Sequence, residues 1–315
     1  MTESDDPRDS LVSSRVRRLE GGEPPHRDPA LTRVRRGYFR PADVKLSISQ
    51  AHRLRIFATA DARATELIFT HASAAALWGA PQLAADLSDV HVTQPGRARR
   101  TTAGVRVHRA AIPDEHVITL ANGLLVASRA WAAVQIAASG SLPGVLLPLD
   151  HLVREIAAER GQNHDEVIES LVGLVPRGSK GRARAERHLR FADARSGSAG
   201  ESLSRGQMRL LEVPMPDLQV RFPRGDQPGD DVVDFDWPAL DTFGEFDGEA
   251  KYFAAEFTQG RSAAEVLWDE KSREDRIRRH RPRGVRWGWK DALSRHRLAR
   301  ILAAAGIVPL RRTCE

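Results

Sequence analysis

An acidic segment is the feature of this sequence that most restricts its fold. Between Asp226 and Ala250 the chain has nine acidic side chains and no lysine or arginine, although its net charge is +6. At the strand period of two, Asp234 and Asp236 in the run VVDFDW share one face. Carboxylates on paired strands repel one another unless a cation lies between them. The segment therefore predicts a divalent metal ion held by oxygen ligands, with a solvated acidic hairpin as the alternative.

A second strand-like run, TFGEFDGEAKY, follows the first. It carries Glu245 and Asp247 on one face, joined by Glu249 and Lys251 if the strand stays regular past Gly248. Lys251 is the first cation after the acids, and an ammonium group near a metal favours deprotonation of an attacking water. The alternative for Lys251 is an ordinary ion pair with one of the neighbouring acids.

Length and composition fit a protein with two folded domains. The 315 residues are 41% hydrophobic and 29% charged, and they contain no run of about 18 apolar residues. The start of the chain, MTESDDPRDS, is polar and acidic, unlike a signal peptide, and the single cysteine, Cys314, excludes an internal disulfide. We therefore expect a cytoplasmic protein without a membrane segment. Its pI near 10.0 favours nucleic acid as a partner.

Turn residues and charge divide the chain into four predicted segments. They are a mobile arm over residues 1–28, a mixed α+β domain over 29–176, a basic linker or helix over 177–199, and an α/β domain over 200–315.

The first domain is predicted to hold amphipathic helices near 47–60 and 70–80 and two strands near 90–93 and 105–109. The loop between the strands contains Arg97, Arg99 and Arg100, which we expect to be exposed and to contact nucleic acid. Four histidines lie in this half without the i, i+4 spacing of a helical metal site, so surface or hydrogen-bonded histidines are expected. They are His71, His91, His108 and His116.

From Val34 to about Arg160, this half resembles the AbiEi-type antitoxins and related transcriptional regulators of type IV toxin-antitoxin systems. The resemblance rests on RRGYF, THASAAALWGAP, DVHVTQPGRARRTTAGVRVHRA and GLLVASRA, in that order. It implies a regulator-like domain that binds DNA or a toxin or defence-system partner protein.

The second domain has a compact series of predicted elements. A helix begins near Glu201 and is followed by three strands, a long helix from Ser262, a further strand and a final helix from about Lys290 to Ala305. This αβββαβ order predicts an α/β domain with a mixed sheet, whose last strand returns by a right-handed crossover.

Residues 200–305 resemble the PD-(D/E)XK nuclease superfamily, in the branch similar to very-short-patch-repair endonucleases. The matching motifs are GESLSR, VDFDW, GEFDGEAKY and VLWDEKSRED. The resemblance implies a restriction-endonuclease-like core in which Glu201, Asp234 and Glu245 bind Mg²⁺ or Mn²⁺ and a lysine orients the attacking water. Asp247 stands where the strict motif has lysine, so the third motif is either Lys251 displaced along the strand or the triplet Glu249-Ala250-Lys251.

A basic region follows the acidic strands and predicts phosphate contacts. The candidate residues are Lys271, Arg273, Arg276, Arg279, Arg283 and Arg286. Trp287 and Trp289 lie within the basic stretch 271–300, and their alternation favours core packing over base stacking. We expect a metal-dependent endonuclease acting on DNA, without a nucleotide cofactor. The competing hypothesis is a non-enzymatic antitoxin or transcriptional regulator that binds DNA or a partner protein.

Overall fold

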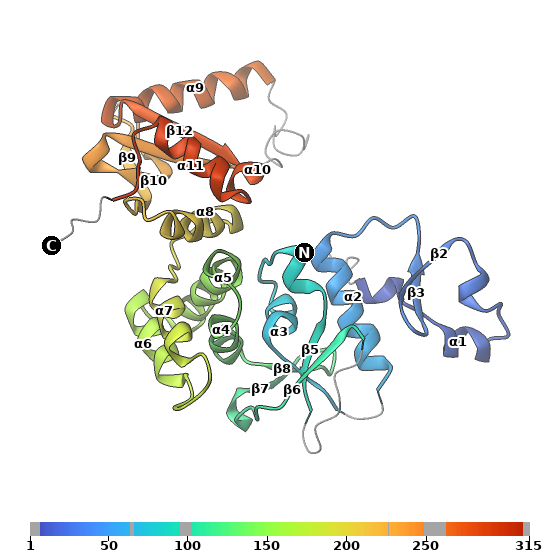
Figure 1. Cartoon of the computed structure of the whole chain (residues 1–315). Coiled ribbons are helices and arrows are strands. Elements are labelled where there is room, and N and C mark those ends of the chain that lie inside the picture. Colours follow the sequence, from blue (N-terminus) through green and yellow to red (C-terminus); the bar gives the residue numbers. More distant parts are fainter. Residues whose placement is uncertain (1–6, 64–65, 95–102, 226, 249–262, 311–315) are drawn as a thin grey trace. The chain divides into compact units, whose positions relative to one another are not determined.

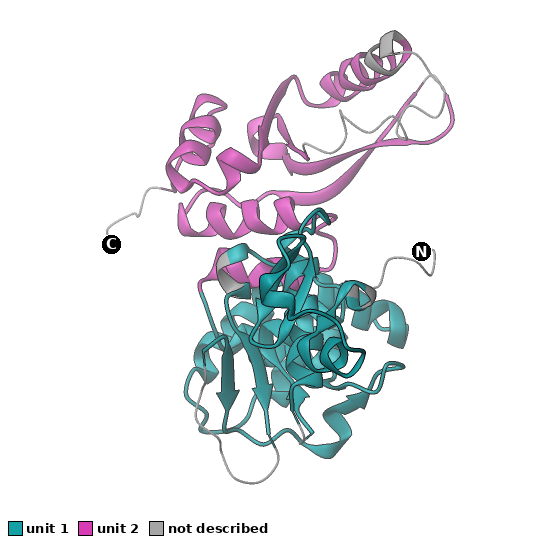
Figure 2. Cartoon of the chain, turned by 90° about the vertical axis from the view of Figure 1, so that its right-hand side faces the viewer, with its two compact units in different colours: residues 1–140, 151–192 teal, residues 141–150, 193–315 magenta. Residues whose placement is uncertain are grey.

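A computed structural model gives the structure of the chain and describes residues 7–63, 66–94, 103–225, 227–248 and 263–310. These residues form a mixed α+β structure, as predicted, and the chain divides into two compact units (Figure 1; Figure 2). The first unit comprises residues 1–140 and 151–192, and the second comprises residues 141–150 and 193–315. Within the described ranges, no helix is both long and apolar enough to cross a membrane.

The units follow the chain differently from the four predicted segments. Helix α5 (Leu142–Arg160) contributes residues to both units, because its beginning, up to Asp150, groups with the second. Helix α7 (Arg182–Phe191) forms within the predicted linker and groups with the first unit. Inside the predicted arm, strand β1 (Val12–Ser13) pairs with β3 (Tyr38–Pro41).

The first unit contains two sheets. A three-stranded antiparallel sheet has the order β1-β3-β2, and a five-stranded mixed sheet has the order β6-β5-β4-β8-β7. The remaining strands are β2 (Leu31–Arg35), β4 (Ile68–Phe69), β5 (Val90–Thr93), β6 (Val105–His108), β7 (Val117–Thr119) and β8 (Leu125–Ala127). The helices are α1 (Ser14–Leu19), α2 (Ile48–Asp61), α3 (His71–Leu77), α4 (Arg129–Ala137), α6 (His164–Leu174) and α7.

Helices α2 and α3 lie close to their predicted positions because the local signals are strong. Ser47 and Gln50 form a capping box at the start of α2, and the buried side chains of Leu54 and Phe57 recur at helical spacing. Strands β5 and β6 pair in parallel, and Val90, opposite Val105, is buried.

The second unit has the predicted order of elements, with the last helix divided in two. The elements are α8 (Ala199–Leu210), β9 (Asp217–Pro223), β10 (Asp230–Trp237), β11 (Thr242–Asp247), α9 (Ala263–His280), β12 (Arg283–Gly288), α10 (Trp289–Ala292) and α11 (Arg295–Ala304). The prediction of one continuous helix from Lys290 was wrong, because Ser294 caps the start of a separate helix, α11. The sheet order is β12-β11-β10-β9, and only the β11–β12 pair is parallel.

Helices cover both faces of this four-stranded sheet. Ile277 of α9 packs on one face with Phe222, Val233 and Phe243. On the other face a Cβ added to Gly200 of α8 would lie 2.0 Å from the Phe246 ring, so only glycine permits this close approach. Trp287 of β12 is buried and donates to Ser204 Oγ of α8, which confirms core packing for this tryptophan.

Candidate active site

Two of the predicted metal ligands meet at one side-chain amide. Glu201 lies in the first turn of α8 and is 5% exposed. Gln219 of β9 donates from a single nitrogen, Nε2, to Glu201 Oε2 at 2.9 Å and to Asp234 Oδ1 at 3.2 Å. The Gly197 backbone N–H donates to the same Glu201 oxygen at 2.7 Å. The structure thus brings together carboxylates from α8 and β10.

The strands beside Asp234 are irregular. The β10–β11 ladder ends at the pair Phe235 and Gly244. Beyond this pair, the side chain of Asp234 replaces a backbone partner, since its Oδ2 accepts the backbone N–H of Phe246 at 2.8 Å. Gln219 of β9, which lies between the partners of Val233 and Phe235, has a φ of 52°, in the left-handed region.

The alternation predicted for β10 fails at Asp234. Val233 packs on the α9 face, whereas Phe235 stacks on Trp287 on the α8 face. In a regular strand, residues two apart would share a face. Asp236 accordingly pairs with Arg281, at 2.7 Å, and does not share the partners of Asp234.

The third predicted ligand, Glu245, is held by arginines. Arg273 of α9 donates to Oε1 at 2.5 Å, and Arg286, opposite Glu245 in the parallel β11–β12 ladder, lies 2.7 Å from Oε2. Arg286 also pairs with Glu270 at 2.7 Å. Both oxygens of Glu245 therefore face a guanidinium group.

The network around Glu245 shifts the pKa values of its members. Burial raises the pKa of Glu245, against the opposing effect of Arg273 and Arg286. Burial works to lower the pKa of each arginine, but the carboxylates of Glu245 and Glu270 hold both pKa values above the usual range. The arginines stay charged, so a metal ion at Glu245 has to compete with two fixed cations.

The other predicted catalytic residues lie at the end of β11 or outside the described residues. Asp247 is the last residue of β11 and is half-buried, and Gly248 follows the strand. Glu249 and Lys251 belong to the range that the structure does not describe, as do Arg97, Arg99 and Arg100.

The predicted phosphate-binding cations fall into two groups. Arg273, Arg276 and Arg286 are half-buried and paired with carboxylates; Arg276 makes two contacts with Asp231, at 2.7 and 3.1 Å. Lys271, Arg279 and Arg283 are exposed. The Arg283 guanidinium donates to the Leu240 carbonyl.

The chemistry of the Glu201–Asp234 pair fits a hard divalent ion, because both groups offer carboxylate oxygens at one point. Glu245 does not complete a compact trio with them. Among the described residues, one set of three or more His, Cys, Asp or Glu side chains has ligand atoms all within 4.8 Å, and it consists of His71, His91 and His108.

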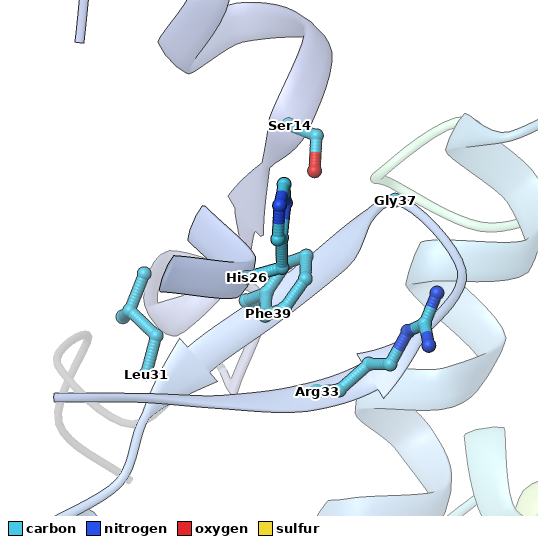
Figure 3. Close-up of a pocket in the computed structure, with 6 residues that line it drawn as sticks. All are labelled: Ser14, His26, Leu31, Arg33, Gly37 and Phe39. Atoms are coloured by element: carbon cyan, nitrogen blue, oxygen red, sulfur yellow. The ribbon is translucent and has the colours of Figure 1, made fainter. Parts of the chain in front are cut away.

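An open pocket of about 520 Å³ lies elsewhere, in the first unit. Figure 3 shows its lining, which includes His26, Arg33 and Phe39 and none of the predicted site residues. Its residues come from the N-terminal antiparallel sheet and the adjoining short helices.

Sequence reasoning missed Gln219, which joins the two carboxylates. The strand pairs Val233–Val220 and Phe235–Leu218 place Gln219 and Asp234 at the same level of the sheet, but this register is known only from the structure. Without knowledge of the register, the role of an uncharged side chain in a short strand cannot be recognised from the sequence.

Comparison with known proteins finds relatives but no family. No family model matches the chain. Two proteins of Mycobacterium tuberculosis, from strains CDC 1551 / Oshkosh and ATCC 25618 / H37Rv and both named as uncharacterized, are each 32% identical over 160 residues. The match covers 50% of this chain and 55% of each relative, so the chain spans about half the length of the curated relatives it matches.

Proposed function

We propose that the second unit is a metal-dependent endonuclease that hydrolyses DNA phosphodiester bonds, with Mg²⁺ or Mn²⁺ as its cofactor. The observation that carries the proposal is the convergence of Glu201 and Asp234 on one nitrogen of Gln219. These carboxylates come from α8 and β10, elements in the order expected of a restriction-endonuclease-like core.

Glu201 and Asp234 would hold the metal ion, with Glu245 as a further ligand once its arginines turn away. When bound, the ion neutralises charge on the phosphoryl group and favours deprotonation of the attacking water. The Gly197 N–H and the Gln219 amide orient Glu201, while the Phe246 N–H fixes Asp234 Oδ2. Arg273 and Arg286 place positive charge beside the carboxylates, where a scissile phosphate would otherwise be repelled.

The test is cleavage of supercoiled plasmid by the full chain with Mg²⁺ or Mn²⁺. Asp234→Asn should lower the cleavage rate by about 100-fold or more, because a metal site supplies several kcal/mol of transition-state stabilisation. Asp230→Asn is the matched control, since Asp230 lies in the same strand, is exposed and is 3.9 Å from Arg221. An inactive wild type, or equal rates for the two variants, would refute the nuclease.

The pairing of Glu245 with two arginines also favours a second function, that of a non-enzymatic antitoxin or transcriptional regulator. In such a protein the arginines permanently occupy the position of a metal, and the unit binds DNA or a toxin or defence-system partner. A Mn²⁺-dependent rise in unfolding temperature that Asp234→Asn abolishes supports the enzyme, whereas its absence supports the regulator. Both proposed functions place the protein in the cytoplasm, because the protein would there meet the DNA and partner proteins that it binds.

A further inference from the structure

Three histidines converge in the first unit from three separate elements. His71 is the first residue of α3, while His91 and His108 lie on the neighbouring parallel strands β5 and β6. The backbone N–H of Thr70 donates to the His91 carbonyl at 3.0 Å, which holds the start of α3 against β5. His91 pairs with Arg106 in the ladder, so His91 and His108 point to the same face.

The imidazole nitrogens are close enough to share one ion. His108 Nε2 lies 3.0 Å from His91 Nδ1, and the His71 and His108 rings stack with centroids 3.7 Å apart. All three side chains offer ligand atoms within 4.8 Å of one another. In a tetrahedral zinc site, Zn–N distances of about 2.0–2.1 Å place ligand nitrogens roughly 3.3 Å apart. Small side-chain rotations would bring the trio to that spacing.

All three rings have lowered pKa values. Burial, reinforced by the neighbouring histidines and Arg106, lowers the pKa of His71 to about 2 and that of His91 to about 4. Burial and Arg106 lower the pKa of His108 as well. The three side chains are half-buried, so they remain open to an ion from solvent.

The backbone of His71 is strained in a way that a packing role does not require. Its φ is 50°, a left-handed conformation that costs a non-glycine residue about 1–3 kcal/mol. Gln135 Oε1 accepts its backbone N–H at 3.0 Å, and Thr70 Oγ1 lies 3.1 Å from Nδ1. That contact leaves Nε2 as the ligand atom, in the manner of metal-binding histidines whose second nitrogen is hydrogen-bonded.

A chain of buried hydrogen bonds holds the backbone of His91 in place. Ser73 Oγ accepts the His91 backbone N–H at 2.8 Å and lies 3.2 Å from His52 Nε2. His52 Nδ1 in turn contacts the Leu87 carbonyl at 3.1 Å. Because both His52 and Ser73 are fully buried, they position β5 and take no part in chemistry at the surface.

We propose that His71, His91 and His108 form a binding site for a divalent transition-metal ion, with Zn²⁺ as its first occupant and a fourth position open to water or a ligand. Three nitrogen ligands select zinc and its neighbours over Mg²⁺. The site is therefore chemically distinct from the carboxylates of the second unit and stands independently of the proposed nuclease.

The experiment uses the full chain stripped with a chelator and titrated with Zn²⁺ against a chromophoric competitor. Wild type should bind one equivalent, and Co²⁺ should give the absorption of a nitrogen-ligated site. His108→Ala should weaken zinc binding at least tenfold, since even outer-sphere partners of such ligands contribute about 10–100-fold. His26→Ala is the matched control, an exposed histidine of the same unit.

A second variant separates metal binding from folding. His71→Asn removes the imidazole but keeps a residue that tolerates the left-handed backbone. It should fold, lose zinc binding, and lose the rise in unfolding temperature that Zn²⁺ gives wild type. Asp234→Asn should keep full zinc binding. Less than one equivalent bound by wild type, or losses in His26→Ala equal to those in His108→Ala, would show that the histidines only pack together.

Discussion

At the scale of single residues, Arg273 decides how the carboxylates can act. Besides Glu245, its guanidinium contacts the Val232 carbonyl at 2.6 Å, on the stretch of β10 beyond the last pair of the β10–β11 ladder. A charge in that position neutralises Glu245 and leaves the Glu201–Asp234 pair as the better point for a metal ion. Arg273 is therefore a structural partner of β10 and β11, and in the proposed nuclease it would contact a phosphate only after leaving Glu245.

His52 makes the first unit sensitive to acid. Its pKa falls to about 4 from an ordinary 6.5, mainly through burial and then through Arg55. The unfolded chain therefore binds this proton at higher pH than the folded chain, so stability is full above about pH 6.5 and falls as the pH drops toward 4. The complete loss is on the order of 3 kcal/mol for this residue.

Urea unfolding near neutral pH and at about pH 5 measures this effect. His52→Gln should be less stable than wild type at neutral pH, because the contacts with Leu87 and Ser73 change. It should nevertheless lose less stability on acidification. Equal losses for wild type and variant would assign the acid sensitivity to other groups.

Sequence reasoning at this scale selected Glu201 and Asp234 as candidate ligands but did not identify the Gln219 amide that donates to both. Acidic residues in a basic chain are visible as a pattern, whereas Gln219 acquires its role only through the strand register. The histidine trio was likewise hidden, since its members come from a helix start and two strands and no short spacing links them.

At the scale of elements, α9 shows where charge counting fails. Arg273, Arg276 and Ile277 lie on one face of this helix, and Ile277 is fully buried. That face packs on the sheet, so its arginines satisfy carboxylates of β10 and β11. The positions of the elements were predictable from periodicity, but the partners of the cations were not, because the acids lie 28 and 45 residues earlier in the chain.

Two arginines of α9 should therefore behave differently when replaced. Arg279→Ala, at an exposed position, should leave stability unchanged. In the plot of log binding constant for DNA against log salt concentration, it should make the slope shallower by about 0.9 for each phosphate that the side chain no longer neutralises. Arg276→Ala should destabilise the second unit by on the order of 2 kcal/mol, because it removes one of the two arginines that pair with the buried Asp231. DNA-binding titrations at several salt concentrations, with thermal unfolding, test both. A stable Arg276→Ala protein with weakened DNA binding would reverse the assignment.

At the scale of the whole molecule, α5 belongs to two units at once. Asp150, 1% exposed, pairs with Arg205 of α8 at 2.7 Å and accepts the Asp193 N–H at 2.9 Å. At the next residue of α8, a Cβ added to Gly206 would lie 2.5 Å from Pro143 Cα. The second unit is thus built partly from residues well inside the first predicted domain. Composition gives no sign of this, because the helix continues through Asp150 with buried aliphatic side chains, such as Leu149 and Leu152, on both sides.

The buried Asp150–Arg205 pair should hold the second unit together more than the first. Asp150→Ala takes away the carboxylate that faces Arg205, which is 4% exposed, and removing one member of a buried pair costs about 3–5 kcal/mol. Hydrogen exchange should therefore quicken in β10 and β11 and stay unchanged in α3 and β5. Glu159→Ala is the matched control on the same helix, because its pair with Arg129 is exposed and worth at most about 1 kcal/mol.

The double variant Asp150→Leu with Arg205→Met should recover most of the protection, since apolar pairs of similar size replace buried ion pairs at little cost. Faster exchange in both units alike, or a double variant as unstable as Asp150→Ala, would mean that this pair does not support the second unit in particular.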